Sequence, residues 1–132
     1  VYFRDEIPKN IKVGSFVIVN TQASTEGQGT HWVCLFHASN AEKWRWVYFD
    51  PLGIPSAPLE IEAITGKGYL SSDHDLQSIS SNNCGVFCLN FIEWCHEEKH
   101  IPIRERYRKF VKLYKENPNR NDRISEKLLR YD

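Results

Sequence analysis

THWVCLFHA at residues 30–38 is followed, after a short polar stretch, by WRWVYFD at residues 44–50. Both stretches are rich in β-branched and aromatic residues, which are typical of strands. Apolar residues occupy both sets of alternating positions in the first stretch, so we predict a central strand that is covered on both faces. Its two faces would carry His31, Val33 and Leu35 on one side and Trp32, Cys34 and Phe36 on the other.

Further elements are predicted on either side of this pair. VGSFVIVNT at residues 13–21 predicts a preceding strand, which the turn-forming residues 26–29 separate from the central one. LEIEAI at residues 59–64 is compatible with a short helix or an alternating strand, and Ser56 as a candidate N-cap favours the helix. DLQSI at residues 75–79 predicts another short strand.

The second half of the chain predicts three helices. Cys84 to His96 has the length and the apolar spacing of a buried helix. Residues 104–117 predict an amphipathic helix, and residues 122–131 a last short one. The expected apolar positions of these two are Tyr107, Phe110, Val111 and Tyr114, then Ile124, Leu128 and Leu129.

These elements predict a single domain over residues 1–132. The 132 residues, 41% hydrophobic and 26% charged, suffice for one modest core. We expect the α+β class, a mostly antiparallel sheet on which the cysteine-bearing helix and the C-terminal helices pack. Because the chain starts at Val1 and holds no Met, we expect it to be part of a longer protein.

The composition also bounds the surroundings of the protein. No apolar run is long enough to span a bilayer, and VYFRDEIPKN at residues 1–10 lacks the order of a signal peptide, so we expect a soluble protein without a membrane partner. The four cysteines lie inside apolar runs, which favours a reducing intracellular compartment over a disulfide scaffold.

Charge is distributed unevenly although the formal net charge is zero. Residues 1–96 hold six Lys/Arg against ten Asp/Glu, and residues 97–132 hold eleven against seven. A basic C-terminal part could attract nucleic acid or an acidic partner. Because its basic residues are interleaved with acids, solvated faces of surface helices are the favoured reading.

The two central strands bring a histidine and a carboxylate together. If Ser39 to Glu42 form a four-residue hairpin loop, residue 38 pairs with residue 43 and His31 lies directly opposite Asp50. Opposed residues point to the same face with Cβ atoms roughly 5 Å apart. In that geometry a carboxylate fixes the tautomer of a general base and stabilises its charged form.

A nucleophile could complete this pair. Cys84 lies at the predicted start of a helix, where unpaired amides and the macrodipole favour a thiolate, and His31 nearby would favour it further. Gly85 leaves room for a substrate to approach the sulfur, and Gln77 could donate to an oxyanion. The same residues also fit simpler roles: Cys84 as a core thiol, His31 in packing and Asp50 as a turn residue.

The remaining cysteines and histidines could suggest a metal site. Cys84, Cys88 and Cys95 are near His96 and His100 in sequence, but the spacing contains no C-x-x-C pair. Cys88 and Cys95 lie among core positions of the predicted helix. We therefore expect a structural role for them and no metal.

Four separated motifs resemble the adenovirus-type cysteine proteases, in the order found in that family. They are VNTQASTEGQGTHW at residues 19–32, YFDPLG at residues 48–53, Gln77, and Cys84-Gly85. The opening of the chain is closest to relatives encoded by self-synthesising DNA transposons and related viruses. These proteases are related to those of ubiquitin-like proteins, and the resemblance implies their α+β fold, with the cysteine-bearing helix against the sheet that carries His and Asp.

The resemblance also implies a role for each residue. His31 would be the general base, Asp50 the acid that orients it, and Cys84 the nucleophile. Gln77 would be the oxyanion donor. Trp32 would flank the substrate channel, with Gly85 at the substrate-binding surface beside the cysteine.

The implied function is that of a cysteine endopeptidase. It would process viral or transposon-encoded precursors, such as capsid proteins, after small residues such as Gly-Gly or Gly-x-Gly. We expect a monomer that acts in the host cytoplasm or nucleus, or within virions. The alternatives are an isopeptidase of a ubiquitin-like modifier, an acyltransferase, and a non-enzymatic capsid-binding or nucleic-acid-binding module with a vestigial site.

No cofactor is required by the sequence. Adenoviral members bond an activating peptide through a cysteine shortly before the oxyanion Gln, and YLSSDHDLQ at residues 69–77 contains none. A disulfide-linked peptide is therefore not expected, and activation by a peptide or by DNA is left open.

Overall fold

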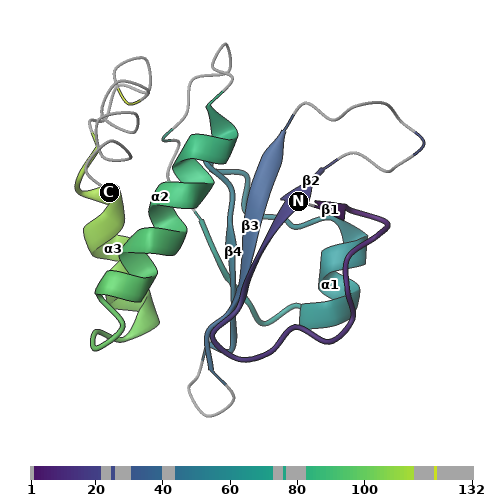
Figure 1. Cartoon of the computed structure of the whole chain (residues 1–132), viewed down its shortest axis with the longest axis horizontal. Coiled ribbons are helices and arrows are strands. Elements are labelled where there is room, and N and C mark those ends of the chain that lie inside the picture. The colour runs from purple at the N-terminus through teal and green to yellow at the C-terminus, as the bar shows by residue number, and fades with distance from the viewer. Residues whose placement is uncertain are drawn as a thin grey trace.

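A five-stranded sheet runs through the centre of the molecule, with helices on both of its faces (Figure 1). The computed structural model describes residues 2–21, 25, 31–39, 44–72, 76, 83–114 and 121. Within these residues the chain forms five strands and three helices, which is the expected α+β class.

The strands lie side by side in the order of the sequence. They are β1 (Tyr2–Phe3), β2 (Phe16–Asn20), β3 (Trp32–His37), β4 (Trp46–Phe49) and β5 (Leu70–Ser71). The pairs β2–β3 and β3–β4 are antiparallel, whereas β1–β2 and β4–β5 are parallel. The three predicted central strands are therefore confirmed, but the sheet is mixed, and the two short edge strands were not predicted.

The first helix, α1 (Leu59–Thr65), confirms the helical alternative for residues 59–64. Its predicted N-cap is wrong. The N-cap is Pro58, whose carbonyl accepts the amides of Ile61 and Glu62 at 3.0 and 3.1 Å, and no side chain caps this end. Ser56 is exposed two residues upstream, beyond the reach of the first turn.

The other two helices are α2 (Cys84–Glu97) and α3 (Ile103–Val111). The helix predicted from Cys84 is confirmed, whereas α3 is shorter than the predicted 104–117. Tyr114 is buried as expected, although it lies beyond the end of α3. Most of the predicted strand 75–79 and all of the predicted helix 122–131 lie outside the described residues, and Leu76, which is described, is not in a strand.

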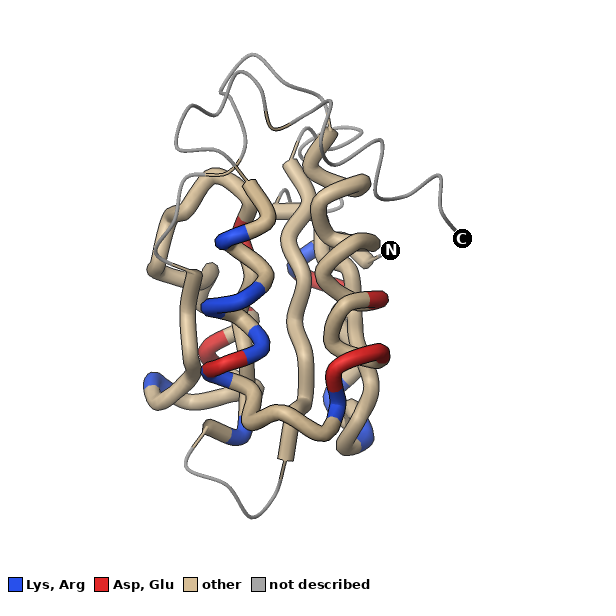
Figure 2. The backbone as a smooth tube through the Cα atoms, turned by 90° about the vertical axis from the view of Figure 1, so that its left-hand side faces the viewer, with Lys and Arg blue, Asp and Glu red and all other residues tan. Residues whose placement is uncertain are grey.

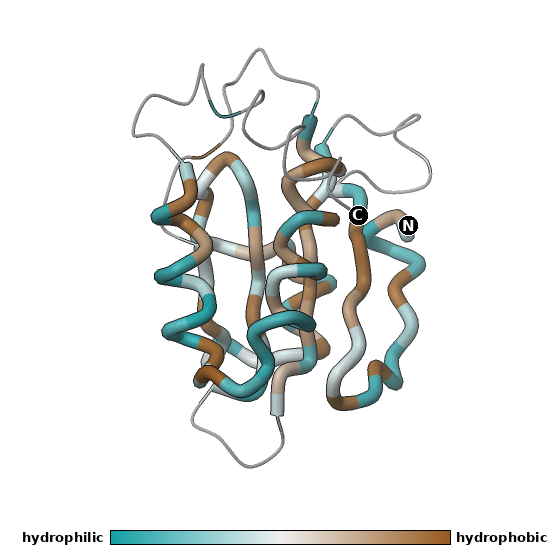
Figure 3. Tube along the Cα trace, turned by 60° about the vertical axis from the view of Figure 1, so that its left-hand side comes forward, coloured by the Kyte–Doolittle hydropathy of each residue, from teal (hydrophilic) through white to brown (hydrophobic). Residues whose placement is uncertain are grey.

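Two apolar cores lie on opposite faces of the sheet, as predicted for a doubly covered central strand. Cys34 and Phe36 of β3 pack with α2 and α3, whereas Val33 and Leu35 pack with Ile61 of α1. Figure 3 shows the matching hydropathy, with hydrophobic segments along the strands and hydrophilic turns along the outer side of α3.

Charged residues on the outer side of α3 are of both signs. Figure 2 shows acidic and basic segments next to one another along this helix. Arg108 Nη1 lies 3.3 Å from Glu105 Oε1, one turn earlier. This is the interleaved pattern of a solvated helix face. Among the described residues, no helix is long and apolar enough to cross a membrane.

The topology gathers three chain segments at one end of the sheet. Antiparallel pairing brings the end of β2, the start of β3 and the end of β4 to the same edge. The first turn of α2 lies at this end as well (Figure 1), and the Trp32 amide reaches Cys84 there. The residues predicted to carry chemistry on these segments are thus brought together.

Candidate active site

His31 and Asp50 form a close pair just beyond the ends of β3 and β4. His31 Nε2 lies 2.7 Å from Asp50 Oδ1. The carboxylate is almost completely buried, with 2% of its surface exposed, and the imidazole is partly buried. A buried carboxylate needs such a partner because burying an unpaired charge is costly.

The register that brings them together differs from the predicted one. The ladder pairs Cys34 with Phe49, and Ala38 donates to the carbonyl of Arg45 rather than pairing with residue 43. His31 is therefore two residues beyond the position directly opposite Asp50. Because a shift of two residues preserves the face, the two side chains are diagonal neighbours and remain within reach.

Asp50 is held by more than the imidazole. Its Oδ1 also accepts the amide of Leu52 at 2.8 Å, as in an Asx-turn. Its own amide donates to Ser72 Oγ at 2.8 Å, and Ser72 Oγ donates back to the Asp50 carbonyl at 3.1 Å. Asp50 is thus both the turn residue and the partner of the histidine. Ser72 was missed because no sequence pattern links it to a residue 22 positions away.

Cys84 is the first residue of α2 and only 6% exposed. Its sulfur accepts the backbone amide of Trp32 at 3.3 Å and is hydrogen-bonded to His31 and to the amide of Gly85. Because Asp50 occupies Nε2 of His31, the second ring nitrogen, Nδ1, is the one left for the thiol. The imidazole therefore bridges the carboxylate and the sulfur.

The electrostatics of this trio favour charge separation. Burial alone would lower the pKa of His31, but hydrogen bonds to Asp50 and Cys84 and the charges of both outweigh it and raise the pKa from 6.5 to about 9. Burial would likewise raise the pKa of Cys84, yet the contacts with His31 and the Trp32 amide lower it below its ordinary value. The geometry thus supports a thiolate beside an imidazolium.

Trp32 and Gly85, both predicted at the substrate-binding surface, are in contact. A Cβ atom placed on Gly85 would lie 2.7 Å from Cε3 of the Trp32 ring. Only glycine lets the ring lie this close to the first turn of α2. The indole is 36% exposed, so it borders the approach to the sulfur.

We expect Gly85→Ala to displace the Trp32 ring and slow the alkylation of Cys84 about tenfold or more, because small misplacements at a reacting centre are costly. Near-ultraviolet circular dichroism would report the ring, and the iodoacetamide reaction would report the thiol. Gly68→Ala is the matched control, since a Cβ there would have nothing within 4 Å. Equal alkylation rates in the two variants would contradict the role of this contact.

Gln77, the predicted oxyanion donor, lies outside the described residues. Its neighbour Leu76 is buried and donates its amide to the carbonyl of Pro51 at 2.9 Å. The chain is thus anchored next to Asp50 one residue before Gln77. No side chain caps the head of α2, and the amides at such a helix N-terminus can stabilise a negative oxygen.

The other three cysteines lie in the core, as predicted for Cys88 and Cys95. Burial raises the pKa of Cys34, of Cys88 and, to about 12, of Cys95, so none of them favours a thiolate. No group of His, Cys, Asp or Glu in the described part of the chain could hold a metal ion.

A thiol, an imidazole and a carboxylate in this order can perform nucleophilic catalysis on a carbonyl. The imidazole can hold the proton that the thiol loses, and the carboxylate can stabilise the resulting cation. The sequence predicted that these three residues would come together, but not the contact of the Trp32 ring with Gly85 or the Trp32 amide as a donor to the sulfur. Compared with protein-family models and with curated proteins, the chain finds no match.

Proposed function

We propose that this protein is a cysteine endopeptidase with Cys84 as nucleophile. The observation that carries the proposal is the continuous link from Asp50 through His31 to the sulfur at the head of α2. A core thiol would need no such partners, since buried cysteines are ordinary apolar residues. The burial of Asp50 beneath an imidazole is likewise unusual for a simple turn residue.

The reaction follows from the roles of these groups. The Cys84 thiolate attacks the carbonyl carbon of the scissile peptide, and the oxygen takes the negative charge beside the amides of α2, with Gln77 as a further donor. His31 then gives its proton to the leaving amine as the carbon–nitrogen bond breaks. Water attacks the thioester while His31 takes its proton, and the carbon–sulfur bond then breaks, which releases the second product and restores the thiolate beside the imidazolium.

The surroundings of the sulfur favour substrates with small side chains. Cys84 is nearly buried, and the Trp32 ring rests on Gly85 beside it. A glycine in the substrate lets its backbone approach closely where a larger side chain would meet the ring. We therefore propose cleavage after small residues such as Gly-Gly or Gly-x-Gly. The resemblance to the adenovirus-type proteases implies viral or transposon-encoded precursors such as capsid proteins as the substrates, and a reducing compartment would keep the thiol free.

The direct test is incubation with a peptide library and with candidate capsid precursors, followed by mass spectrometry of the new termini. We expect new termini after small residues, and none when Cys84 has first been alkylated. Cleavage that survives alkylation would refute the mechanism. Labelling of Cys84 only by a ubiquitin-like modifier with a C-terminal electrophile, without any endoproteolysis, would replace this proposal with a deconjugase.

We expect the rate of hydrolysis to depend on pH as a bell. The lower limb reflects loss of the Cys84 proton, whose pKa lies below the ordinary thiol value. The upper limb reflects loss of the His31 proton at about pH 9, because the raised pKa keeps the imidazolium present below that pH. Asp50→Asn removes the carboxylate whose hydrogen bond and charge raise the pKa of His31, so the upper limb should move to lower pH. An unmoved limb in kcat/KM profiles would contradict the assignment.

A further inference from the structure

The segment that carries His31 is held by a residue ten positions earlier in the chain. Thr21 follows β2 and meets His31 across the strand ends. Its amide donates to the His31 carbonyl at 2.9 Å, and its Oγ1 donates to the same oxygen at 3.2 Å. Two donors from one residue hold the His31 backbone in a single position relative to β2.

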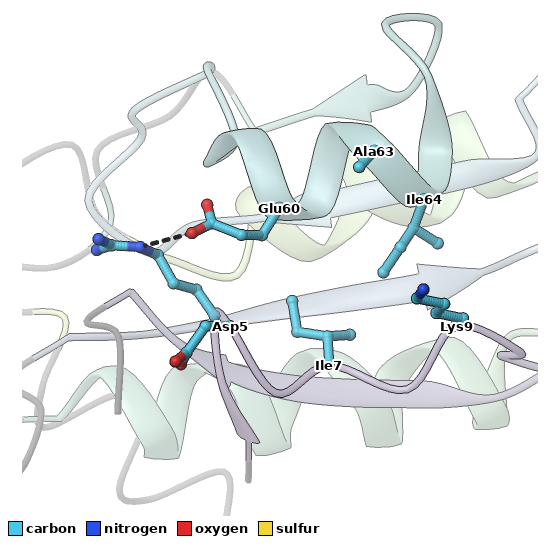
Figure 4. Close-up of a pocket in the computed structure, with 7 residues that line it drawn as sticks. Asp5, Ile7, Lys9, Glu60, Ala63 and Ile64 are labelled. Atoms are coloured by element: carbon cyan, nitrogen blue, oxygen red, sulfur yellow. Dashed lines mark hydrogen bonds and ion pairs between the residues drawn. The ribbon is translucent and has the colours of Figure 1, made fainter. Parts of the chain in front are cut away.

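Arg4 in turn holds Thr21. Its Nη1 donates to the Thr21 carbonyl at 2.6 Å, a short charge-assisted bond, while its Nε pairs with Glu60 Oε2 of α1 at 3.1 Å. The dashed line in Figure 4 marks this second contact. One guanidinium thus ties three parts of the fold together: the segment after β1, the end of β2, and α1.

Arg4 lies at the end of a very short strand and beside a groove. β1 is only two residues long, and Arg4 follows it directly. Between this segment and α1 lies an open groove of about 520 Å³ lined by Ile7, Lys9, Ala63 and Ile64 among others (Figure 4). Beside this groove, the Arg4–Glu60 pair connects the segment directly to α1, and the bond to Thr21 connects it to the end of β2.

We infer that Arg4, acting through Thr21, positions His31 for the proposed chemistry. The inference rests on the proposed function only in its consequence for hydrolysis, since the position of the imidazole relative to Cys84 can be measured without a substrate. An imidazole displaced from the sulfur stabilises the thiolate less, so the alkylation profile of Cys84 reports its position.

The test compares Arg4→Met with Arg4→Lys. Arg4→Met removes both donors, and we expect the pH midpoint of Cys84 alkylation to rise toward that of an ordinary thiol and kcat to fall about tenfold, with KM within about twofold. Arg4→Lys keeps one charged donor for the Thr21 carbonyl and should recover most of the loss. Alkylation at Cys84 is followed by mass spectrometry of its peptide.

Two control variants separate the positioning role of Arg4 from the general loss of an arginine charge and from the loss of the ion pair with Glu60. Arg108→Met removes an exposed arginine that also has an acidic partner and should keep the wild-type profile. Glu60→Gln removes the ion pair while leaving the bond to Thr21, so its profile should shift less than that of Arg4→Met. If Arg4→Met does not fold, Thr21→Val against Thr21→Ser tests the second half of the link, from Thr21 to the His31 carbonyl, because only serine keeps the hydroxyl that donates to it. The valine variant should raise the alkylation midpoint and lower kcat, and the serine variant should match the wild type.

The outcomes distinguish this inference from the proposed function. A wild-type alkylation profile in Arg4→Met, or in Thr21→Val where that variant is used, would overturn the inference whatever the protease assay shows. A shifted profile in a protein that cleaves no substrate would support the positioning role and reject the endopeptidase.

Discussion

Replacing Cys84 by alanine is expected to abolish peptide hydrolysis, with kcat at least about 10⁴-fold lower than that of the wild type. Removal of a nucleophile leaves only the contribution of substrate binding and oxyanion stabilisation. The free energy of unfolding should change little by comparison, since the side chain that is lost is small. Single-turnover assays on a substrate from the library experiment, together with urea unfolding, would measure both quantities.

Cys88→Ala is the matched control for this change, because Cys88 lies one turn further along α2. Its sulfur is fully buried in the core and contacts the Trp32 carbonyl at 3.7 Å. We expect this variant to lose about 1 kcal/mol of stability through the small cavity, and to keep its kcat. The opposite pattern, with activity lost in Cys88→Ala and kept in Cys84→Ala, would show that Cys84 is not the nucleophile.

The central strands and α2 could be predicted because their signals are local. A run such as VCLF at residues 33–36 has no amphipathic helical pattern, and apolar side chains at consecutive positions are typical of a strand that is buried on both faces. The strands β1 and β5 have two residues each. Strands this short form only where a longer neighbouring strand has unpaired backbone groups along its edge. Ser56 failed as a cap because Pro58, two residues later, occupies the N-cap position and sets the entry conformation of the helix.

The candidate site was predicted in its residues but not in its geometry. A hairpin register cannot be read from composition, and the assumed pairing of residue 38 with residue 43 was wrong by two positions. The His31–Asp50 pair survived this error since an even shift keeps both side chains on one face. Arg4 and Ser72 escaped prediction because each acts through a contact between distant segments, for which a single sequence carries no signal.

The largest effect on stability is expected from Phe91→Ala. Phe91 is fully buried on α2, and its ring stacks on Phe49 of β4 at 4.5 Å and meets Phe110 of α3 edge-on at 5.3 Å. Truncating such a side chain costs about 3–5 kcal/mol, which is a large share of the 5–15 kcal/mol that a domain typically has. The urea midpoint should fall by about 2 M.

Leu89→Ala is the control on the same helix, because it also introduces alanine into α2 but removes an exposed side chain instead of a buried one. Leu89 is 46% exposed, so its truncation should cost less than about 1 kcal/mol. If both variants lost the same stability, α2 would not be held on the sheet by the cluster around Phe91. That result would also bear on the site, because α2 carries Cys84 at its first residue and is placed against β3 and β4 by this packing. The position of the thiol beside His31 therefore depends on the aromatic core as much as on its own hydrogen bonds.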